Sequence, residues 1–285
     1  MPKVKNDTES LVKEYLDKHA DKITEQTRRT YLSVGSRIPF NILTTQQTII
    51  KKLKEVDDNP NTTALNLNVI ILVRRSNEED TSKLVAYRNS LRERIVKLRK
   101  AKLAEIKHEL PSMETLESLL KEMQGLPYVI NYLFLRYGLR NKDINLLIVD
   151  KLPEEMDKNE NYLVQQDGKK KSASLYINDY KTDSSYGAKV IKIRDSRFNR
   201  ELRKMGLKDG DYLFSKKNGG KMSLSTFNEK IKSMSLNNLG EAKIFKVLIA
   251  HLIDKKDYKK IEALVDTRGT SMTTIMKSYN IYNSE

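Results

Sequence analysis

The stretch from Tyr132 to Leu147 constrains the fold more than any other part of the chain. An apolar segment at helical spacing runs into Gly138, and glycine at that point predicts that the helix ends there. Arg140 follows, and Asp143 opens the next apolar turn. An arginine held at a helix junction suits a phosphate group, because its planar fork donates two parallel charge-assisted hydrogen bonds. A plain helix-capping turn would use the same glycine, so the bend alone leaves both interpretations open.

Net charge is the strongest signal in the composition. The chain has 285 residues, with 53 Lys and Arg against 38 Asp and Glu, and its formal net charge is +15. The excess is divided almost evenly between residues 1–108 and the remainder, so it is not a basic tail. Two folded parts that both face a polyanion would have this pattern, although a solubilising surface would have it too. On charge alone, a nucleic acid is the partner that we expect.

Several classes of site are excluded by residue type. The chain contains no cysteine, which rules out disulfides, thiolate catalysis and cysteine-bound zinc. Its histidines have no ligand-like spacing, so we expect no metal site, and His251 is interpreted as a packed core histidine. The amino terminus is polar, and the longest apolar run, near Leu67–Val73, is too short for a bilayer. These features predict a soluble intracellular protein that does not associate with a membrane.

Residues 1–108 are predicted to form a helical domain. Apolar residues recur at helical spacing through Leu11–Leu16, Ile42–Leu53, Leu65–Val73 and Leu84–Leu98. Basic side chains then gather over residues 92–108. They include Arg92, Arg99, Lys100 and Lys102. This segment is interpreted either as a solvated helix face or as a basic linker helix that lies along a phosphate backbone.

Residues 109–285 are predicted to form a second domain that begins at Leu110-Pro111-Ser112. Ser112 suits the N-cap of a helix over Met113–Met123, and a second helix spans Pro127–Tyr137.

After this helix, the spacing of the apolar residues changes from that of a helix to the alternation typical of short strands. These are predicted at Tyr162–Gln165, Ala173–Ile177 and Lys189–Ile193. Helices resume at Arg197–Met205, at Leu224–Met234 and from Glu241 onward. The chain is therefore predicted to be mostly α with a small antiparallel sheet, an α+β fold.

The pattern Gly-Leu-Arg-x-x-Asp at residues 138–143 resembles the first arginine box of the tyrosine recombinases, the phage-integrase family, in which Gly-Leu-Arg-x-x-Glu is usual. Later motifs follow the order of the same family. Tyr180-Lys181-Thr182 stands where the family has a lysine between two strands, and residues 222–231 match the segment that leads into its second box. Thr27-Arg-Arg-Thr-Tyr31 resembles the start of the family's core-binding domain, which would make Arg28 and Arg29 DNA contacts.

The second and third boxes depart from the family pattern. Lys243 and Lys246 stand in the places of the family's His or Lys and of its second arginine, three residues apart on one side of a helix. Arg268 stands where His or Trp is usual. Tyr279 follows about two residues later than the nucleophile of most relatives, and Tyr282 is a second candidate.

The resemblance implies a two-domain DNA clamp, with a helical core-binding domain at 1–108 and a tyrosine-recombinase catalytic domain at 109–285. It implies a site-specific recombinase or integrase that cleaves and rejoins double-stranded DNA through a 3′-phosphotyrosyl intermediate, self-associated as a dimer or tetramer. It further implies no metal or other cofactor, no small-molecule substrate, and an intracellular location in association with DNA. The implied catalytic residues are Arg140, Lys181, Lys243, Lys246, Arg268 and Tyr279. Lysine does not replace a bidentate guanidinium, so the departures also suit a protein of this fold that has lost cleavage and serves as a DNA-binding or structural factor.

Overall fold

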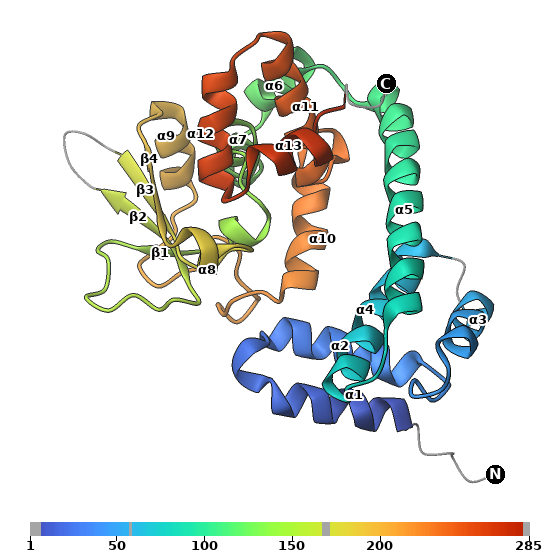
Figure 1. The fold of residues 1–285 in the computed structure, drawn as a ribbon. Coiled ribbons are helices and arrows are strands. Elements are labelled where there is room, and N and C mark those ends of the chain that lie inside the picture. Colours follow the sequence, from blue (N-terminus) through green and yellow to red (C-terminus); the bar gives the residue numbers. More distant parts are fainter. Residues whose placement is uncertain (1–6, 57–58, 167–171, 282–285) are drawn as a thin grey trace. The chain divides into compact units, whose positions relative to one another are not determined.

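The structure is a computed structural model that describes residues 7–56, 59–166 and 172–281 (Figure 1). The chain divides into two compact units, Met1–Leu103 and Ala104–Glu285. Helix α5 (Ser82–Glu109) continues past the end of the first unit and stops directly before Leu110, where the second domain was predicted to begin.

Helices build the described part of the first unit. They are α1 (Asp7–Lys18), η1 (Ala20–Lys22), α2 (Glu25–Arg37), α3 (Gln46–Val56), α4 (Pro60–Ser76) and most of α5. Helices α1, α2 and α4 pack against one another over an apolar core. The Asn59 side chain accepts a hydrogen bond from the Asn61 amide, and Pro60 occupies the first turn of α4. Both features set the helix start, because proline loses no helical hydrogen bond there.

The second unit combines helices with one small sheet. Its helices are α6 (Met113–Glu122), α7 (Gly125–Tyr137), η2 (Lys142–Ile144), α8 (Asp183–Tyr186), α9 (Ser196–Lys204), α10 (Leu224–Met234), η3 (Leu236–Asn238), α11 (Glu241–Asp254), α12 (Tyr258–Arg268) and α13 (Met272–Ser278). Its strands are β1 (Leu146–Val149), β2 (Asn161–Gln166), β3 (Ser172–Ile177) and β4 (Lys189–Ile193).

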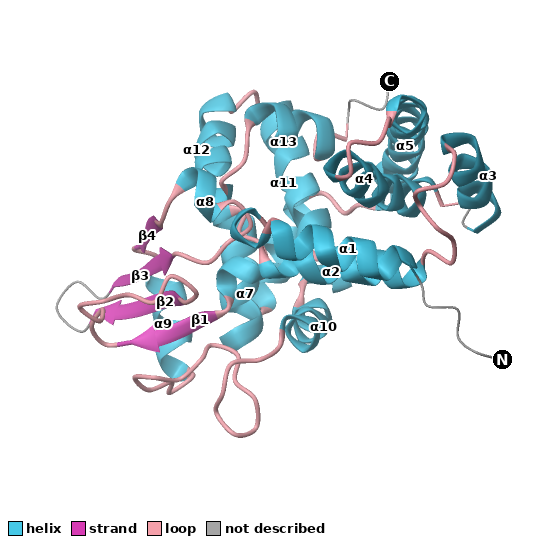
Figure 2. Ribbon diagram, turned by 60° about the horizontal axis from the view of Figure 1, so that its bottom comes forward, coloured by secondary structure: helices cyan, strands magenta, loops and turns pink. Residues whose placement is uncertain are grey.

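The sheet has the order β1-β2-β3-β4 and is mixed, not purely antiparallel (Figure 2). Strands β2, β3 and β4 pair antiparallel, as predicted, whereas β1 pairs parallel to β2. Residues 150–160 return the chain to the same end of the sheet, and this return makes the first pair parallel. Strand β1 was missed because a run of four apolar residues has no period that separates a strand from a buried helical turn.

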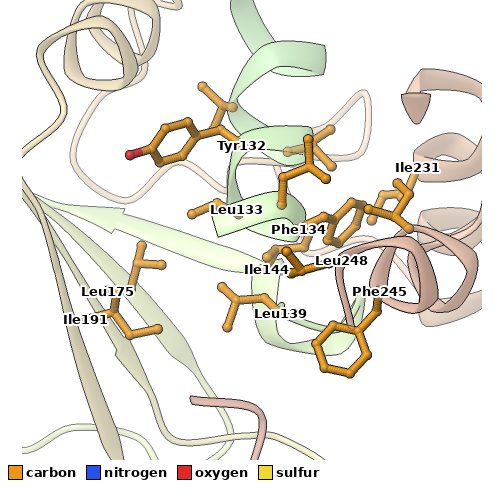
Figure 3. Close-up of a cluster of buried hydrophobic side chains, with 14 of the residues drawn as sticks. Tyr132, Leu133, Phe134, Leu139, Ile144, Leu175, Ile191, Ile231, Phe245 and Leu248 are labelled. Carbon is orange, nitrogen blue, oxygen red and sulfur yellow. The ribbon is translucent and has the colours of Figure 1, made fainter. Parts of the chain in front are cut away.

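Helix α7 is the centre of the second unit. Every side chain from Tyr128 to Leu135 is buried, as expected for a helix that is apolar all round and packed on several sides. It contacts α6, α9, α11 and α12, while α9 also contacts β3. Figure 3 shows part of the resulting core, with Phe134 of α7, Leu175 of β3 and Leu248 of α11 among its buried side chains.

Other local predictions are confirmed. Helix α6 begins after Ser112, whose hydroxyl accepts from the Thr115 amide at 3.2 Å. Strands β2, β3 and β4 cover the three predicted strand segments, and α10 has the predicted bounds. The helical region from Glu241 onward is not continuous, since it divides into α11, α12 and α13.

Candidate functional site

The turn after α7 presents Arg140. The helix ends at Gly138, which has a φ of 62° and donates from its amide to the Phe134 carbonyl oxygen at 3.1 Å. A carboxylate oxygen of Asp143 accepts from the Arg140 amide at 2.8 Å and fixes the bend. A Cβ atom at Gly138 would lie 2.6 Å from Cε2 of Phe245. Glycine is therefore required both by the left-handed conformation and by the close approach of α11.

The Arg140 side chain points to the end of α12. Its guanidinium donates to the backbone carbonyl oxygen of Arg268, 128 residues later in the chain. Burial lowers the pKa of Arg140, and the positive charge of Arg268 lowers it further. Two guanidinium groups thus lie close enough to repel each other, which is a feature of sites built to receive an anion.

Arg268 is deeply enclosed, with 1 % of the residue exposed. One terminal nitrogen donates to the Gly138 carbonyl oxygen at 2.5 Å, and the other donates to the Glu241 carboxylate at 3.2 Å. The guanidinium carbon lies 4.1 Å from the centre of the Phe245 ring. These contacts link the arginine turn, the start of α11 and the end of α12.

Tyr279 completes this cluster. It follows the last helical residue of α13, and its hydroxyl accepts a hydrogen bond of 3.3 Å from Arg268. Its ring packs edge-on against Phe245, with 4.8 Å between the ring centres. The structure therefore brings Arg140, Arg268 and Tyr279 together, whereas Tyr282 lies outside the described residues.

Asp143 carries a buried carboxylate beside this cluster. One oxygen holds the Arg140 amide, and the other is buried without a hydrogen-bond partner. Burial raises the pKa of Asp143 to about 6, although the charges of Arg140 and Arg268 act in the opposite direction. The carboxyl thus titrates in the mildly acidic range, because the fold disfavours its charged form.

Lys181 lies on the segment between β3 and β4, and its side chain is exposed. The residues on both sides of it are tied to the cluster. Asp179 forms an ion pair with Lys142, two residues beyond Arg140. The Thr182 hydroxyl donates to the Gly269 carbonyl oxygen at 2.5 Å, directly after Arg268. The Lys181 backbone is therefore anchored between the two arginine-bearing turns.

Lys189 belongs to the same neighbourhood and was missed by the sequence reasoning. Its amino group donates to the carbonyl oxygens of Asp266 and Thr267, in the last turn of α12, and lies 4.5 Å from the centre of the Tyr180 ring. Burial lowers the pKa of Lys189 to about 8, and the positive charge of Arg140 acts in the same direction. No sequence signal could have found it, because these partners lie 77 and 78 residues away.

The remaining candidates of the second box lie on α11. Lys243 and Lys246 are both half-buried on the helix that supplies Glu241 and Phe245, and their part in the site stays a prediction. His251 is not a packed core histidine as predicted. Its side chain is 30 % exposed and its Nδ1 lies 3.8 Å from a carboxylate oxygen of Glu114, because it stands at the rim of the apolar face of α11.

The DNA-contact candidates of the first unit divide into two groups. Arg28 and Arg29 on α2 already have carboxylate partners, Asp17 at 2.6 Å and Glu25 at 3.0 Å. Exposed cations make up the other group on α5. They are Arg92, Arg99, Lys100 and Lys102.

Within the described residues, no group of three or more His, Asp or Glu side chains is placed to hold a metal ion. Nor does any helix in the same part of the chain combine the length and the apolar character that crossing a membrane requires.

No protein-family model matches the chain, and no curated protein matches it in sequence. Among solved structures, the crystal structure of XerA recombinase is similar, with a TM-score of 0.38 and 11 % sequence identity over 98 % of this chain and 95 % of that chain. A similarity this weak carries no argument about function.

Proposed function

We propose that the protein is a DNA strand-exchange enzyme that cleaves and rejoins DNA with Tyr279 as the nucleophile. The proposal rests on one observation above all. The hydroxyl of Tyr279 accepts a hydrogen bond from Arg268, whose backbone carbonyl oxygen in turn accepts one from Arg140. Tyr279 lies beside two arginines, and one of them, Arg140, is on the turn that resembles the family's first arginine box. This arrangement suits nucleophilic attack on a phosphodiester.

The chemistry needs no external source of energy. The Tyr279 oxygen attacks the phosphorus atom, the bond to the 5′ oxygen breaks, and a 3′-phosphotyrosyl bond forms. A 5′-hydroxyl of a partner strand reverses the same steps and releases the tyrosine. The protein must supply positive charge to the phosphoryl oxygens, a proton for the leaving oxygen and a base for the phenol.

The cations divide these tasks. Arg140 holds a phosphoryl oxygen, and Lys246 adds a second positive charge. Lys181 protonates the leaving 5′ oxygen, since its backbone is tied to both arginine turns while its side chain stays exposed. Lys243 assists removal of the phenolic proton. Arg268 acts on the Tyr279 oxygen directly, because its guanidinium donates to Gly138, Glu241 and Tyr279 within the protein.

DNA binding is proposed to involve both units, the second through the cations of the candidate site and the first through basic side chains of α2 and α5. Arg92, Arg99, Lys100 and Lys102 on α5, with Arg28 and Arg29 on α2, would neutralise phosphates along the duplex and close a two-domain clamp. Strand exchange between two duplexes requires more than one active site, so the protein is proposed to act as a dimer or tetramer on DNA inside the cell.

A second candidate function is a DNA-binding or structural factor without cleavage activity. The burial of Arg268 favours it, because a buried guanidinium whose two terminal nitrogens both donate within the protein is not presented to a phosphate. The lysine at position 246 favours it too, since a lysine cannot form the bidentate contact.

A suicide-substrate selection tests the proposal without knowledge of the target sequence. The full chain is incubated with a library of randomised duplexes, each nicked so that a short 5′-hydroxyl fragment diffuses away after cleavage. We expect a covalent protein–DNA adduct on a denaturing gel, absent from Tyr279→Phe and retained by Tyr282→Phe. Arg140→Ala should reduce the rate of adduct formation by about a hundredfold or more.

The outcomes separate the two candidate functions. An adduct that depends on Tyr279 supports the enzyme. Tight, salt-sensitive binding to duplex DNA without any adduct supports the binding factor. An adduct that persists in Tyr279→Phe would assign the nucleophile elsewhere.

A further inference from the structure

Asn161, the first residue of β2, holds the turn that carries Arg140. Only 2 % of the residue is exposed. Its amide nitrogen donates to the carbonyl oxygens of Lys142 and Asp143, at 3.4 Å each. Both carbonyls belong to the short helix η2 that follows Arg140, so Asn161 stabilises this turn by hydrogen bonds.

The same side chain holds the segment that carries Lys181. The amide nitrogen of Asn161 also donates to the Asp179 carbonyl oxygen at 2.9 Å. Its oxygen accepts from the amides of Asn178 and Asp179, at 2.8 Å each. One buried side chain thus joins two segments that are both proposed to contact the same phosphate.

The chemistry of this position requires an amide. On one side the side chain meets carbonyl oxygens, which need a donor, and on the other it meets backbone N–H groups, which need an acceptor. Aspartate would place a carboxylate oxygen against three carbonyls, and alanine would leave buried backbone groups without partners. An ion pair between Lys142 and Asp179 also joins the two segments. Because their side chains are 40 % and 27 % exposed, this ion pair contributes less than the buried hydrogen bonds of Asn161.

We propose that Asn161 is a positioning residue, which sets the separation between the Arg140 turn and the Lys181 segment so that both act on one phosphodiester. The inference rests on the proposed function, since it assigns the phosphate contact to Arg140 and the proton donor to Lys181. It concerns a residue that the motif resemblance does not include.

The chain offers a matched control at Asn178. This asparagine lies on the same segment, and its amide nitrogen donates to the carbonyl oxygens of Glu160 at 3.1 Å and Asp157 at 3.5 Å. Neither acceptor belongs to the arginine turn. Asn178→Ala therefore removes comparable hydrogen bonds from the lysine segment without separating it from Arg140.

The first test does not depend on activity. Hydrogen exchange is measured on the full chain for wild type, Asn161→Ala and Asn178→Ala. We expect Asn161→Ala to lose protection together at residues 140–145 and 178–182, whereas Asn178→Ala loses none at 140–145. Unchanged protection in Asn161→Ala, or loss on one side only, would overturn the inference.

A second variant covers the case in which alanine does not fold. Asn161→Ser keeps a donor and an acceptor on a shorter side chain, so it should fold with weaker ties to both segments. If both variants lose native circular dichroism, Asn161 is a core residue required for folding and the inference is wrong.

The second test uses the chemistry of the leaving group. Cleavage is measured on the selected duplex and on the same duplex with sulfur in place of the bridging 5′ oxygen. A thiolate leaves without a proton, because a thiol has a pKa of about 8.5 whereas an alcohol is far less acidic. We expect Asn161→Ala to slow cleavage of the oxygen substrate by about a hundredfold. The share of that loss that comes from the proton donor should disappear on the sulfur substrate, as the loss should for Lys181→Ala. The share that comes from the Arg140 turn should remain.

The two tests keep the inference and the proposed function apart. If wild type forms no adduct on either substrate, the proposed function fails, and hydrogen exchange alone still decides whether Asn161 couples the two segments. If Asn161→Ala is equally slow on both substrates, the residue does not position the proton donor.

Discussion

Arg268 donates a hydrogen bond to the carbonyl oxygen of Gly138, 130 residues earlier in the chain. This bond joins the end of α12 to the end of α7, and the same guanidinium holds Glu241 and Tyr279. The candidate site is therefore organised around the buried guanidinium of Arg268, which also holds the helices of the second unit together.

Replacing Arg268 with methionine should destabilise the second unit. The substitution leaves the buried Gly138 carbonyl and the partly buried Glu241 carboxylate without their donor, and such a loss costs about 3–5 kcal/mol where the pair is fully buried. Hydrogen exchange of the slowest amides in α7 and α11 measures this loss. Arg29→Met on α2 is the control, since its pair with Glu25 is exposed and contributes less than about 1 kcal/mol. Equal effects of the two substitutions would mean that Arg268 has no structural role.

Gly138→Ala should be more costly than Gly125→Ala. Both glycines have positive φ values, 62° and 57°, so alanine is strained at either position by roughly 1–2 kcal/mol. Only at Gly138 does the new Cβ meet a neighbour, Cε2 of Phe245 at 2.6 Å, while nothing lies within 4 Å at Gly125. We expect the close contact to add about 1–3 kcal/mol in urea denaturation.

A double substitution identifies the cause of that difference. If Phe245 is responsible, Phe245→Leu should make Gly138→Ala less costly, and the two changes should show a favourable coupling energy. Additive costs would instead assign the whole effect to the backbone.

The sequence predicted those parts of this site that are encoded locally. Glycine before an arginine marks the end of α7, and alternating apolar residues mark β2, β3 and β4. The missed residues are those whose role depends on distant partners. Glu241 lies 27 residues from Arg268, and Asn161 lies 18 or 19 residues from the carbonyls that it holds. Neither position has a pattern of its own in the sequence.

The proximity of Arg140, Arg268 and Tyr279 was predicted from the order of the motifs that resemble the tyrosine recombinases. The physical chemistry of the three residues alone would not have predicted it. The contacts of Arg268 differ from those expected. It was predicted to supply positive charge to a phosphate, whereas its guanidinium donates to Gly138, Glu241 and Tyr279. Its burial under Phe245 and Tyr279 follows from the packing of α11 and α13, which no local property of residues 266–271 reveals.

Asp143→Asn should change how stability depends on pH. The folded-state pKa of Asp143 is raised to about 6 from 3.8, so the folded protein binds more protons than the unfolded chain between these values. The free energy of unfolding should therefore fall as pH rises from 4 to 6, by roughly 2–3 kcal/mol for this group. The difference between wild type and Asp143→Asn, measured by urea denaturation across pH 4–7, isolates the effect.

Glu229→Gln on the exposed face of α10 is the control for this series. It removes one exposed carboxylate, so it measures what the loss of a single acidic side chain does to the profile. If the profile of Asp143→Asn runs parallel to that of wild type, the carboxyl of Asp143 does not titrate near 6 in the folded protein.

Lys189 should titrate near pH 8. After reductive methylation with ¹³C-formaldehyde, one lysine resonance is expected to shift with a midpoint of about 8. Lys189→Arg must remove that resonance, while Lys192→Arg, on the same strand, must leave it. Because the folded state holds fewer protons here than the unfolded chain, this group should make the protein more stable as pH rises from about 8 toward 10.5.

The salt dependence of DNA binding tests the basic segment of α5. Each phosphate that a protein neutralises contributes a slope of about −0.9 to the plot of log affinity against log salt concentration. Arg99, Lys100 and Lys102 are exposed on α5, so replacing all of them with glutamine should make the slope less steep by up to roughly 2.7 if each one contacts a phosphate. The matched control replaces Lys13, Lys18 and Lys22 with glutamine. These side chains are also exposed, and their replacement removes the same net charge from the first unit. A purely long-range effect of net charge would change both slopes equally, whereas direct phosphate contacts would change only the first. An unaltered slope in the α5 variant would exclude this segment from the DNA interface and leave Arg28, Arg29 and Arg92 as the remaining candidates of the first unit.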